Sequence, residues 1–309
     1  MTFRPWREAT ESALYGPDGF YLRETVAAHF RTSVTSSVAF VHAIRRLAGL
    51  VDEALGWPDP FDVVDVGAAD GALLEALPDV PPRWRLTGVD VAPDPGIAAR
   101  WSSAIPAVTG LLFANEWLDN VPLDVVESGR LVLVDTDGTE RLGPSSPYDA
   151  WVRRWWPAGD RVEVGLPRDR AWSDAVSQVS RGLAVAIDYG HTLPDRRPTL
   201  TGYRHGLQVP PVPDGTCDIT AHVALDSVAA ATGARLMTQR DALRHLGVSG
   251  QLPAYEGDGS GYALALQRAS DSGVLLDPAG LGGFGWVVQE VGISLPWLSG
   301  AGRDDESRG

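Results

Sequence analysis

A short buried run that ends in a glycine turn constrains the fold of this chain more than any other feature. Phe61–Val66 is largely β-branched, Gly67–Gly71 forms a turn, and Ala72–Leu77 begins a helix. A strand, a turn, a helix and a second strand in this order are typical of a parallel sheet with helices on its faces. Further buried strands of this sheet are expected at Arg85–Asp90, Gly110–Ala114, Gly182–Asp188 and Gly285–Val291. We therefore predict an α/β fold with a Rossmann-like sheet.

The chain divides into a helical start, a core and an insertion. Apolar residues recur every three or four positions over Ser37–Leu55, which predicts a helix. The expected divisions are a helical N-terminal segment (1–60), an α/β core (61–122 and 182–299), an inserted β-hairpin region with helices (123–181) and a disordered tail (300–309). The insertion should hold strands at Leu123–Glu127, Leu131–Asp135 and Thr139–Leu142.

Several further elements are expected from local patterns. Helices are predicted at Asp149–Trp156, Pro167–Arg181 and Arg240–Leu246. Within Asp218–Thr232, Thr220 is a start signal and a helix is expected after it. Pro194–Pro213 should form a long loop with an extended piece, and Ala234–Thr238 a strand. Gly257–Gly261 should be a flexible break.

Composition excludes whole classes of function. The formal net charge of −14 argues against nucleic acid and anionic membranes as partners. All 26 basic residues are arginine, so no Schiff-base or phosphate-loop lysine exists. Cys217 is the one cysteine, which excludes internal disulfides and cysteine-ligated clusters. We see no clustered metal ligands and no apolar run long enough to span a bilayer, so we expect a cytoplasmic protein without metal or membrane insertion.

The glycine turn carries the clearest chemistry. Gly67, Ala69 and Gly71 can let a ligand approach the main chain, and Asp90, at the end of the next strand, can accept ribose hydroxyls. A dinucleotide, S-adenosylmethionine or a merely structural turn would each fit this arrangement. Asp65 favours S-adenosylmethionine, because a carboxylate repels a pyrophosphate but attracts an ammonium and a sulfonium.

A second polar cluster follows the third predicted strand. Asn115 offers an amide, and Glu116 and Asp119 would share a face if the segment were one helical turn. Asp188 ends a core strand at the same edge of the sheet. Such carboxylates favour a cationic methyl acceptor. Alternatively, the acidic residues only offset the dipole of a helix.

Five segments together resemble the MidA-like methyltransferases, which include a mitochondrial assembly factor for respiratory complex I. The resemblance runs from about Tyr15 to about Val291. The five segments are Asp65–Gly71, Ala114–Pro122, Ile187–Gly190, Leu200–Arg204 and Cys217–Val223. The resemblance is most specific in the second and the fifth of them.

The resemblance implies a class I methyltransferase fold, S-adenosylmethionine as cofactor and methylation of a protein arginine. It also implies that Phe30, Thr32 and Ser33 border the cofactor. Residues 28–35 stand where the family has the N-terminal motif Gly-Asp-Phe-x-Thr-Ser-Pro-Glu, and they lack the Asp and the Glu of that motif. The middle glycine of the turn is Ala69.

These observations predict an S-adenosylmethionine-dependent N-methyltransferase that acts on a protein, such as a respiratory-complex subunit, and that can form a homodimer. Glu116, Asp119 and Asp188 would be catalytic. The cofactor would be held by Phe30, Thr32, Ser33, Asp65, Gly67, Ala69, Gly71, Asp90 and Asn115. A methyltransferase-like assembly factor or binding module without turnover is the main alternative, and a nicotinamide oxidoreductase is a more distant one.

Overall fold

A computed structural model of the chain describes residues 2–23, 37–251 and 259–300. Its main sheet is seven-stranded within these ranges, and the strands from β10 to β4 run parallel. Strand β17 runs antiparallel to both of its neighbours. The order across the sheet is β16 (Arg235–Thr238), β17 (Gly285–Val291), β10 (Val179–Asp188), β5 (Val108–Asn115), β2 (Phe61–Val66), β3 (Trp84–Val89) and β4 (Arg100–Ser102).

Strand β2 lies at the centre of the fold, and all six of its residues are buried. A strand covered on both faces needs a near-continuous apolar run, which explains the sequence pattern. It carries two buried carboxyls, and the first, Asp62, is paired with Arg85 and accepts a hydrogen bond from the N–H of Thr109. The predicted Rossmann-like α/β fold is therefore confirmed.

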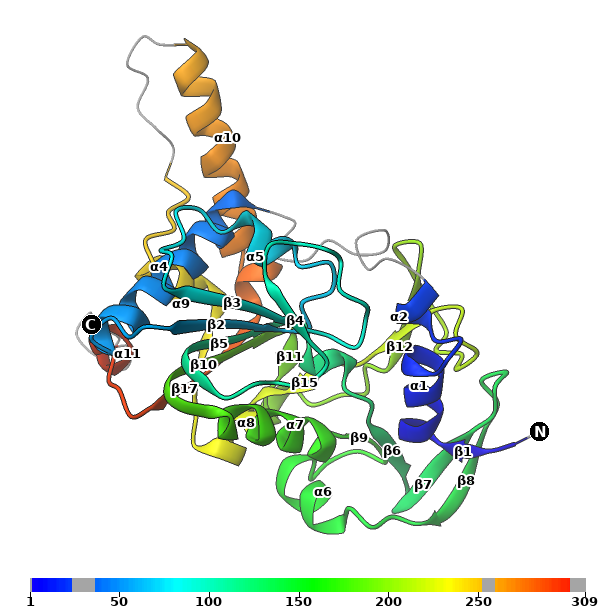
Figure 1. Cartoon of the computed structure of the whole chain (residues 1–309). Coiled ribbons are helices and arrows are strands. Elements are labelled where there is room, and N and C mark those ends of the chain that lie inside the picture. Colours follow the sequence, from blue (N-terminus) through cyan, green and yellow to red (C-terminus); the bar gives the residue numbers. More distant parts are fainter. Residues whose placement is uncertain (1, 24–36, 252–258, 301–309) are drawn as a thin grey trace, which may run out of the picture.

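Helices cover both faces of the main sheet (Figure 1). Helix α4 begins after Ser37, whose hydroxyl accepts the N–H of Ala39. One face carries α4 (Val38–Ala54), α5 (Ala72–Ala76), α9 (Gln239–His245), α10 (Gly259–Leu276) and α11 (Pro296–Gly300). The other carries α7 (Leu166–Ser177) and α8 (Leu225–Thr232).

A second sheet lies beside the main one (Figure 1) and contains the hairpin strands of the predicted insertion. It consists of β1 (Arg4–Pro5), β6 (Asp124–Glu127), β7 (Arg130–Val134), β8 (Glu140–Ser145) and β9 (Arg161–Val164). The hairpin strands are confirmed, whereas β1 and β9 were not expected. Around this sheet lie α1 (Trp6–Tyr15), α2 (Phe20–Arg23) and α6 (Asp149–Trp155).

Two small sheets connect the second sheet to the core. One pairs β11 (Gly190–His191) with β15 (Val223–Ala224). The other joins β12 (Thr201–Arg204), β13 (Leu207–Val209) and β14 (Asp218–Thr220). Trp6, Ile219 and Val125 share one apolar cluster, so the N-terminal helix α1, β14 and the insertion pack as a unit.

Three local predictions were wrong. The helix expected to reach Arg181 ends at Ser177, because Val179 and the residues after it pair with β5. The helix expected after Thr220 begins only at Leu225, since Val223 and Ala224 pair with β11. The expected break overlaps α10, which begins at Gly259. In the first two cases pairing with other strands overrides local propensity.

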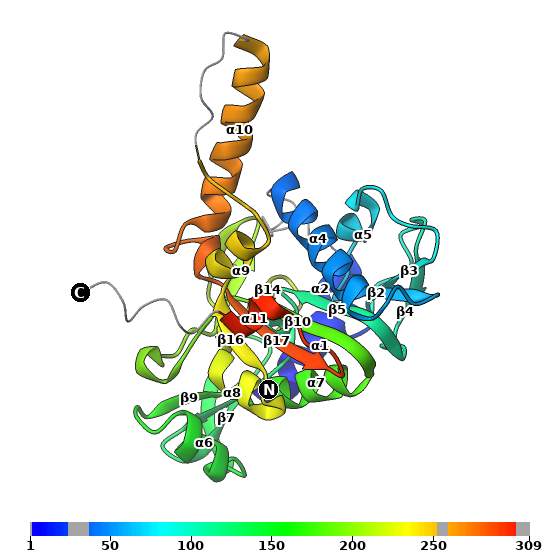
Figure 2. The same cartoon turned by 90° about the vertical axis from the view of Figure 1, so that its left-hand side faces the viewer.

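Helix α10 projects away from the body in both views (Figure 1, Figure 2). Over the described ranges, no helix has both the length and the apolar character needed to cross a bilayer. The expected tail beyond Gly300 lies outside the described residues.

Candidate functional site

The carboxyl ends of β2, β3, β5 and β10 meet at one edge of the sheet. From β2 the chain moves outward through β3 and β4, and then returns to the other side of β2 to form β5 and β10. The order therefore reverses between β2 and β5. In open α/β sheets, ligands bind at such a reversal. The predicted site residues that can be placed all follow or end these four strands.

The turn after β2 has an unusual backbone. Gly67, Ala69 and Gly71 have φ of 74°, 51° and 75°, which is the left-handed region. A Cβ on Gly67 would lie 3.1 Å from the Trp117 ring, so a larger residue would be crowded there. The sequence favours this shape because glycine adopts positive φ at little cost.

Asp65 is buried at the end of β2, with 5% of its surface exposed. No other described side chain forms an ion pair with it. Burial, followed by the charges of Asp90 and Asp70, raises its pKa to about 8. A carboxyl group in this environment is stabilised in its charged form by a nearby cation.

Asp90 ties the end of β3 to this turn. One carboxylate oxygen accepts the N–H of Ala69 at 2.8 Å, and the other accepts the N–H of Ala92 at 2.8 Å. The carboxylate is thus held by the backbone beside the turn. Each oxygen keeps a lone pair for a further donor such as a hydroxyl.

The segment after β5 does not form the single helical turn on which the shared face of Glu116 and Asp119 depended. Glu116 has a left-handed φ of 52°, and a short 3-10 turn follows at Leu118–Asn120. Glu116 is held by its N–H, which donates to the carbonyl of Ile187 at 2.8 Å. Its side chain accepts from Nδ2 of Asn115 at 3.0 Å. Glu116 is partly exposed, whereas Asp119 is buried.

Asp119 and Asp188 form a buried carboxyl pair behind Glu116. The N–H of Asp119 donates to Oδ2 of Asp188 at 3.1 Å. Oδ2 of Asp119 accepts the hydroxyls of Tyr189 and Thr220. Burial raises the pKa of both carboxyls, and the hydroxyl donors oppose this rise only at Asp119. Asp188 therefore holds a proton more readily than Asp119 does.

Arg168, which the sequence did not single out, joins the two loops that flank this pair. It is 2% exposed, and its guanidinium donates only to backbone carbonyls among the described residues. The acceptors are the carbonyls of Asp119, Val121, Ala221 and His222, at 2.5 to 3.1 Å. Its positive charge opposes the rise that burial causes in the pKa of both carboxyls.

Two tyrosines from the N-terminal helices also reach this edge and were missed. The hydroxyl of Tyr15 donates to the carbonyl of Asn120 at 2.9 Å. The Tyr21 hydroxyl lies 2.7 Å from both Oδ1 of Asn120 and Oδ1 of Asp218. Nothing local in the sequence indicates these contacts, because about 100 residues or more separate the partners. Phe30, Thr32 and Ser33 lie outside the described residues.

The residues at this edge fit a ligand with a cation and ribose hydroxyls. Among the described residues, Asp65 is a buried carboxyl without a compensating cation, and Oδ1 of Asn115 is buried without a hydrogen-bond partner. Asp90 offers oxygens to hydroxyl donors beside the turn. Within the ranges that the structure covers, no group of three or more His, Cys, Asp or Glu side chains could hold a metal ion.

Two solved structures from Burkholderia thailandensis have a similar fold. One is a COG1565 superfamily protein bound to S-adenosyl-homocysteine, with 22% identity, a TM-score of 0.76, and coverage of 95% of this chain and 89% of its own. The other is a native structure of a COG1565 superfamily protein, with 23% identity, a TM-score of 0.78, and coverage of 95% and 88%. No curated protein matches the chain.

Residues 83–241 match the family described as "Putative S-adenosyl-L-methionine-dependent methyltransferase". The match spans Asp90, Asn115, Glu116, Asp119 and Asp188, and it covers more than half of the 309 residues. The chain therefore belongs to this family, and it is a class I methyltransferase that uses S-adenosylmethionine.

Proposed function

We propose that this enzyme methylates a nitrogen of a cationic protein side chain, and that the side chain is arginine. The observation that carries the proposal is the group of carboxyls at the ends of β5 and β10. Among them, Oδ1 of Asp119 and Oδ1 of Asp188 are buried and have no hydrogen-bond partner in the part of the chain that the structure describes. Carboxylates bind a planar guanidinium with paired hydrogen bonds. The resemblance to MidA-like methyltransferases supports arginine as the acceptor.

The cofactor half of the site would use the turn after β2. In the proposed arrangement Asp65 faces the cationic part of the cofactor, and Asp90 accepts its ribose hydroxyls. Gly67, Ala69 and Gly71 let the main chain approach it, and Asn115 supplies an amide. Phe30, Thr32 and Ser33 join this set through the family resemblance. Bound S-adenosylmethionine supplies a methyl group on a positively charged sulfur.

The acceptor half would use Glu116 directly. Glu116 is the least buried of the three predicted catalytic carboxyls, and its backbone is fixed by the bond to Ile187. It would orient the guanidinium and take the proton that the nitrogen loses when it is methylated. Asp119 and Asp188 would supply a hydrogen-bond network behind it. The bond of Glu116 to Ile187, the residue before Asp188, places the two carboxyl-bearing residues side by side.

Label transfer tests this proposal. Purified enzyme and methyl-labelled S-adenosylmethionine are added to a lysate from cells that lack the protein, and the labelled proteins are hydrolysed to amino acids. We expect the label in methylated arginine, and a strongly reduced amount with Glu116→Gln. Label in another amino acid, or in a small molecule, would contradict the assignment of arginine.

A further inference from the structure

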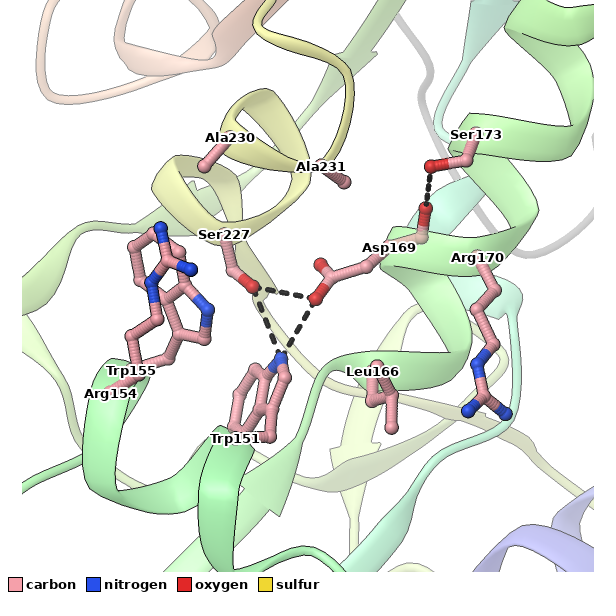
Figure 3. A pocket seen from close by; sticks show the side chains of 10 residues that line it. All are labelled: Trp151, Arg154, Trp155, Leu166, Asp169, Arg170, Ser173, Ser227, Ala230 and Ala231. Carbon is pink, nitrogen blue, oxygen red and sulfur yellow. Dashed lines mark hydrogen bonds between the residues drawn. The ribbon is translucent and has the colours of Figure 1, made fainter.

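A hollow of about 300 Å³ lies on the outer side of α7, between α6 and α8 (Figure 3). It is separate from the site described above. Arg168 on α7 points toward the loop at Asp119, whereas Asp169 and Ser173 on the same helix line the hollow. The volume is in the range of ligand-binding pockets.

The floor of the hollow is a hydrogen-bonded triangle that ties three helices together (Figure 3). Oδ2 of Asp169 on α7 accepts from Trp151 on α6 at 2.8 Å and from Ser227 on α8 at 2.7 Å. Trp151 also donates to Ser227 at 3.1 Å. Asp169 is 7% exposed, and its Oδ2 is occupied by these two donors, so the carboxylate serves to hold the three helices together.

Two arginines stand on opposite sides of this floor (Figure 3). Arg154 and Arg170 are exposed and form no ion pair or hydrogen bond with any described residue. The guanidinium of Arg154 stacks on the Trp155 ring, 4.6 Å from its centroid. Stacking holds the guanidinium in place while its N–H groups stay available. The exposed charges lining the hollow are therefore both positive.

The remaining lining is mostly apolar. The Trp155 ring, Leu166 and the Ala230–Ala231 pair lie between or beside the two arginines. An occupant should therefore carry an apolar side chain with carboxylates on either side of it. Local positive charge is the exception on a chain of net charge −14. A short acidic segment is attracted mainly by the nearby arginines. A long polyanion is also repelled by the negative charge on the rest of the protein surface.

We propose that this hollow is a docking site for an acidic peptide segment of a partner protein, with one apolar side chain seated on the tryptophans. Arg154 and Arg170 would bind the flanking carboxylates, and Trp155 would pack on the apolar side chain. The proposal does not depend on which nitrogen the enzyme methylates. It adds a recognition surface on the side of α7 opposite the loop at Asp119.

Fluorescence anisotropy with a labelled peptide tests the proposal on the full-length chain. The probe is fluorescein-labelled Glu-Glu-Leu-Phe-Glu-Glu. We expect saturable binding with a Kd below about 1 mM, weakened several-fold when salt rises from about 50 to about 300 mM. A peptide with lysine in place of each glutamate should not bind.

Charge reversal locates the binding site. Arg154→Glu with Arg170→Glu should weaken binding at least about tenfold, because two attractive contacts become repulsive. Arg235→Glu with Arg244→Glu makes the same change in net charge at exposed arginines outside the hollow, and it should leave binding within about twofold. Trp155→Ala should weaken binding without changing its salt dependence.

Three results would overturn the proposal. One is the absence of saturable binding to the wild-type chain. Another is equal loss of binding in both charge-reversal variants while circular dichroism shows that both are folded. The third is stronger competition by a single-stranded oligonucleotide or by anionic vesicles than by unlabelled peptide, which would assign the hollow to a different class of partner.

Discussion

The two halves of the carboxyl edge are held together in different ways. At the ends of β2 and β3, the defining contact joins a side chain to a backbone N–H only 21 residues away, from Asp90 to Ala69. At the ends of β5 and β10, side chains 49 to 101 residues from Asp119 bond to it: Arg168, Asp188 and Thr220. The first half is a local turn, and the second is a buried network.

This difference predicts how a substitution in each half should affect the protein. The cofactor half has a partly exposed carboxylate held by the backbone, so a substitution there should reduce affinity and leave the fold intact. The acceptor half encloses a guanidinium and two carboxyls away from water. Removing one member leaves the others without compensation, which is costly in a low-dielectric interior. Substitutions there should cost stability as well as turnover.

The largest effect is expected for Arg168→Met. The change leaves four backbone carbonyls without their donor and removes the cation near Asp119 and Asp188. The free energy of unfolding should fall by about 3–5 kcal/mol, measured by urea denaturation. Arg170→Met, on the exposed side of the same helix, is the matched control and should change it by less than about 0.5 kcal/mol. Similar values for both variants would remove the contrast between the two halves.

Glu116→Gln should come next in size. The substitution keeps the shape of the side chain but removes the group proposed to take the proton. We expect turnover to fall about 100-fold, or about 2.7 kcal/mol, with cofactor affinity nearly unchanged. Labelled methyl transfer and calorimetric titration measure the two quantities. Glu53→Gln, at an exposed position on α4, serves as the control. A large loss of cofactor affinity would move Glu116 into the cofactor half.

The smallest effect is expected for Asp90→Asn. One oxygen can still accept a backbone N–H, so the turn should persist. Loss of the negative charge should weaken cofactor binding about tenfold, or about 1.4 kcal/mol, with the melting temperature nearly unchanged. Calorimetry and thermal denaturation test this together. Unfolding of this variant would show that the cofactor half is as interdependent as the acceptor half.

The same contrast explains what could be predicted from the sequence. The strand, the turn and Asp90 are encoded by neighbouring residues, so their arrangement follows from pattern and spacing. The chemistry of Asn115, Glu116, Asp119 and Asp188 was visible as residue types at strand ends. Their burial was not visible, because it depends on contacts with distant parts of the chain.

Arg168 shows the limit most clearly. It lies within a predicted helix, where an arginine is ordinarily a solvated side chain. Its burial results from packing of α7 under the loops at Val121 and His222, which no local pattern indicates. Tyr21 is similar, since its partner Asp218 is 197 residues away. Pairing of Val223 and Ala224 with β11 likewise delays the helix expected after Thr220 until Leu225.

Proton release on cofactor binding tests the central claim, that buried carboxyls at this edge receive a cationic cofactor. With a pKa of about 8, Asp65 is mostly protonated near neutral pH in the free enzyme. A bound cation favours the ionised form, so binding at about pH 7 should release nearly one proton, and affinity should rise with pH up to about pH 8. Titration calorimetry of S-adenosylmethionine in buffers of different protonation enthalpy should show this release in the wild-type enzyme and not in Asp65→Asn. Binding without proton release, or equal release in both proteins, would contradict the account.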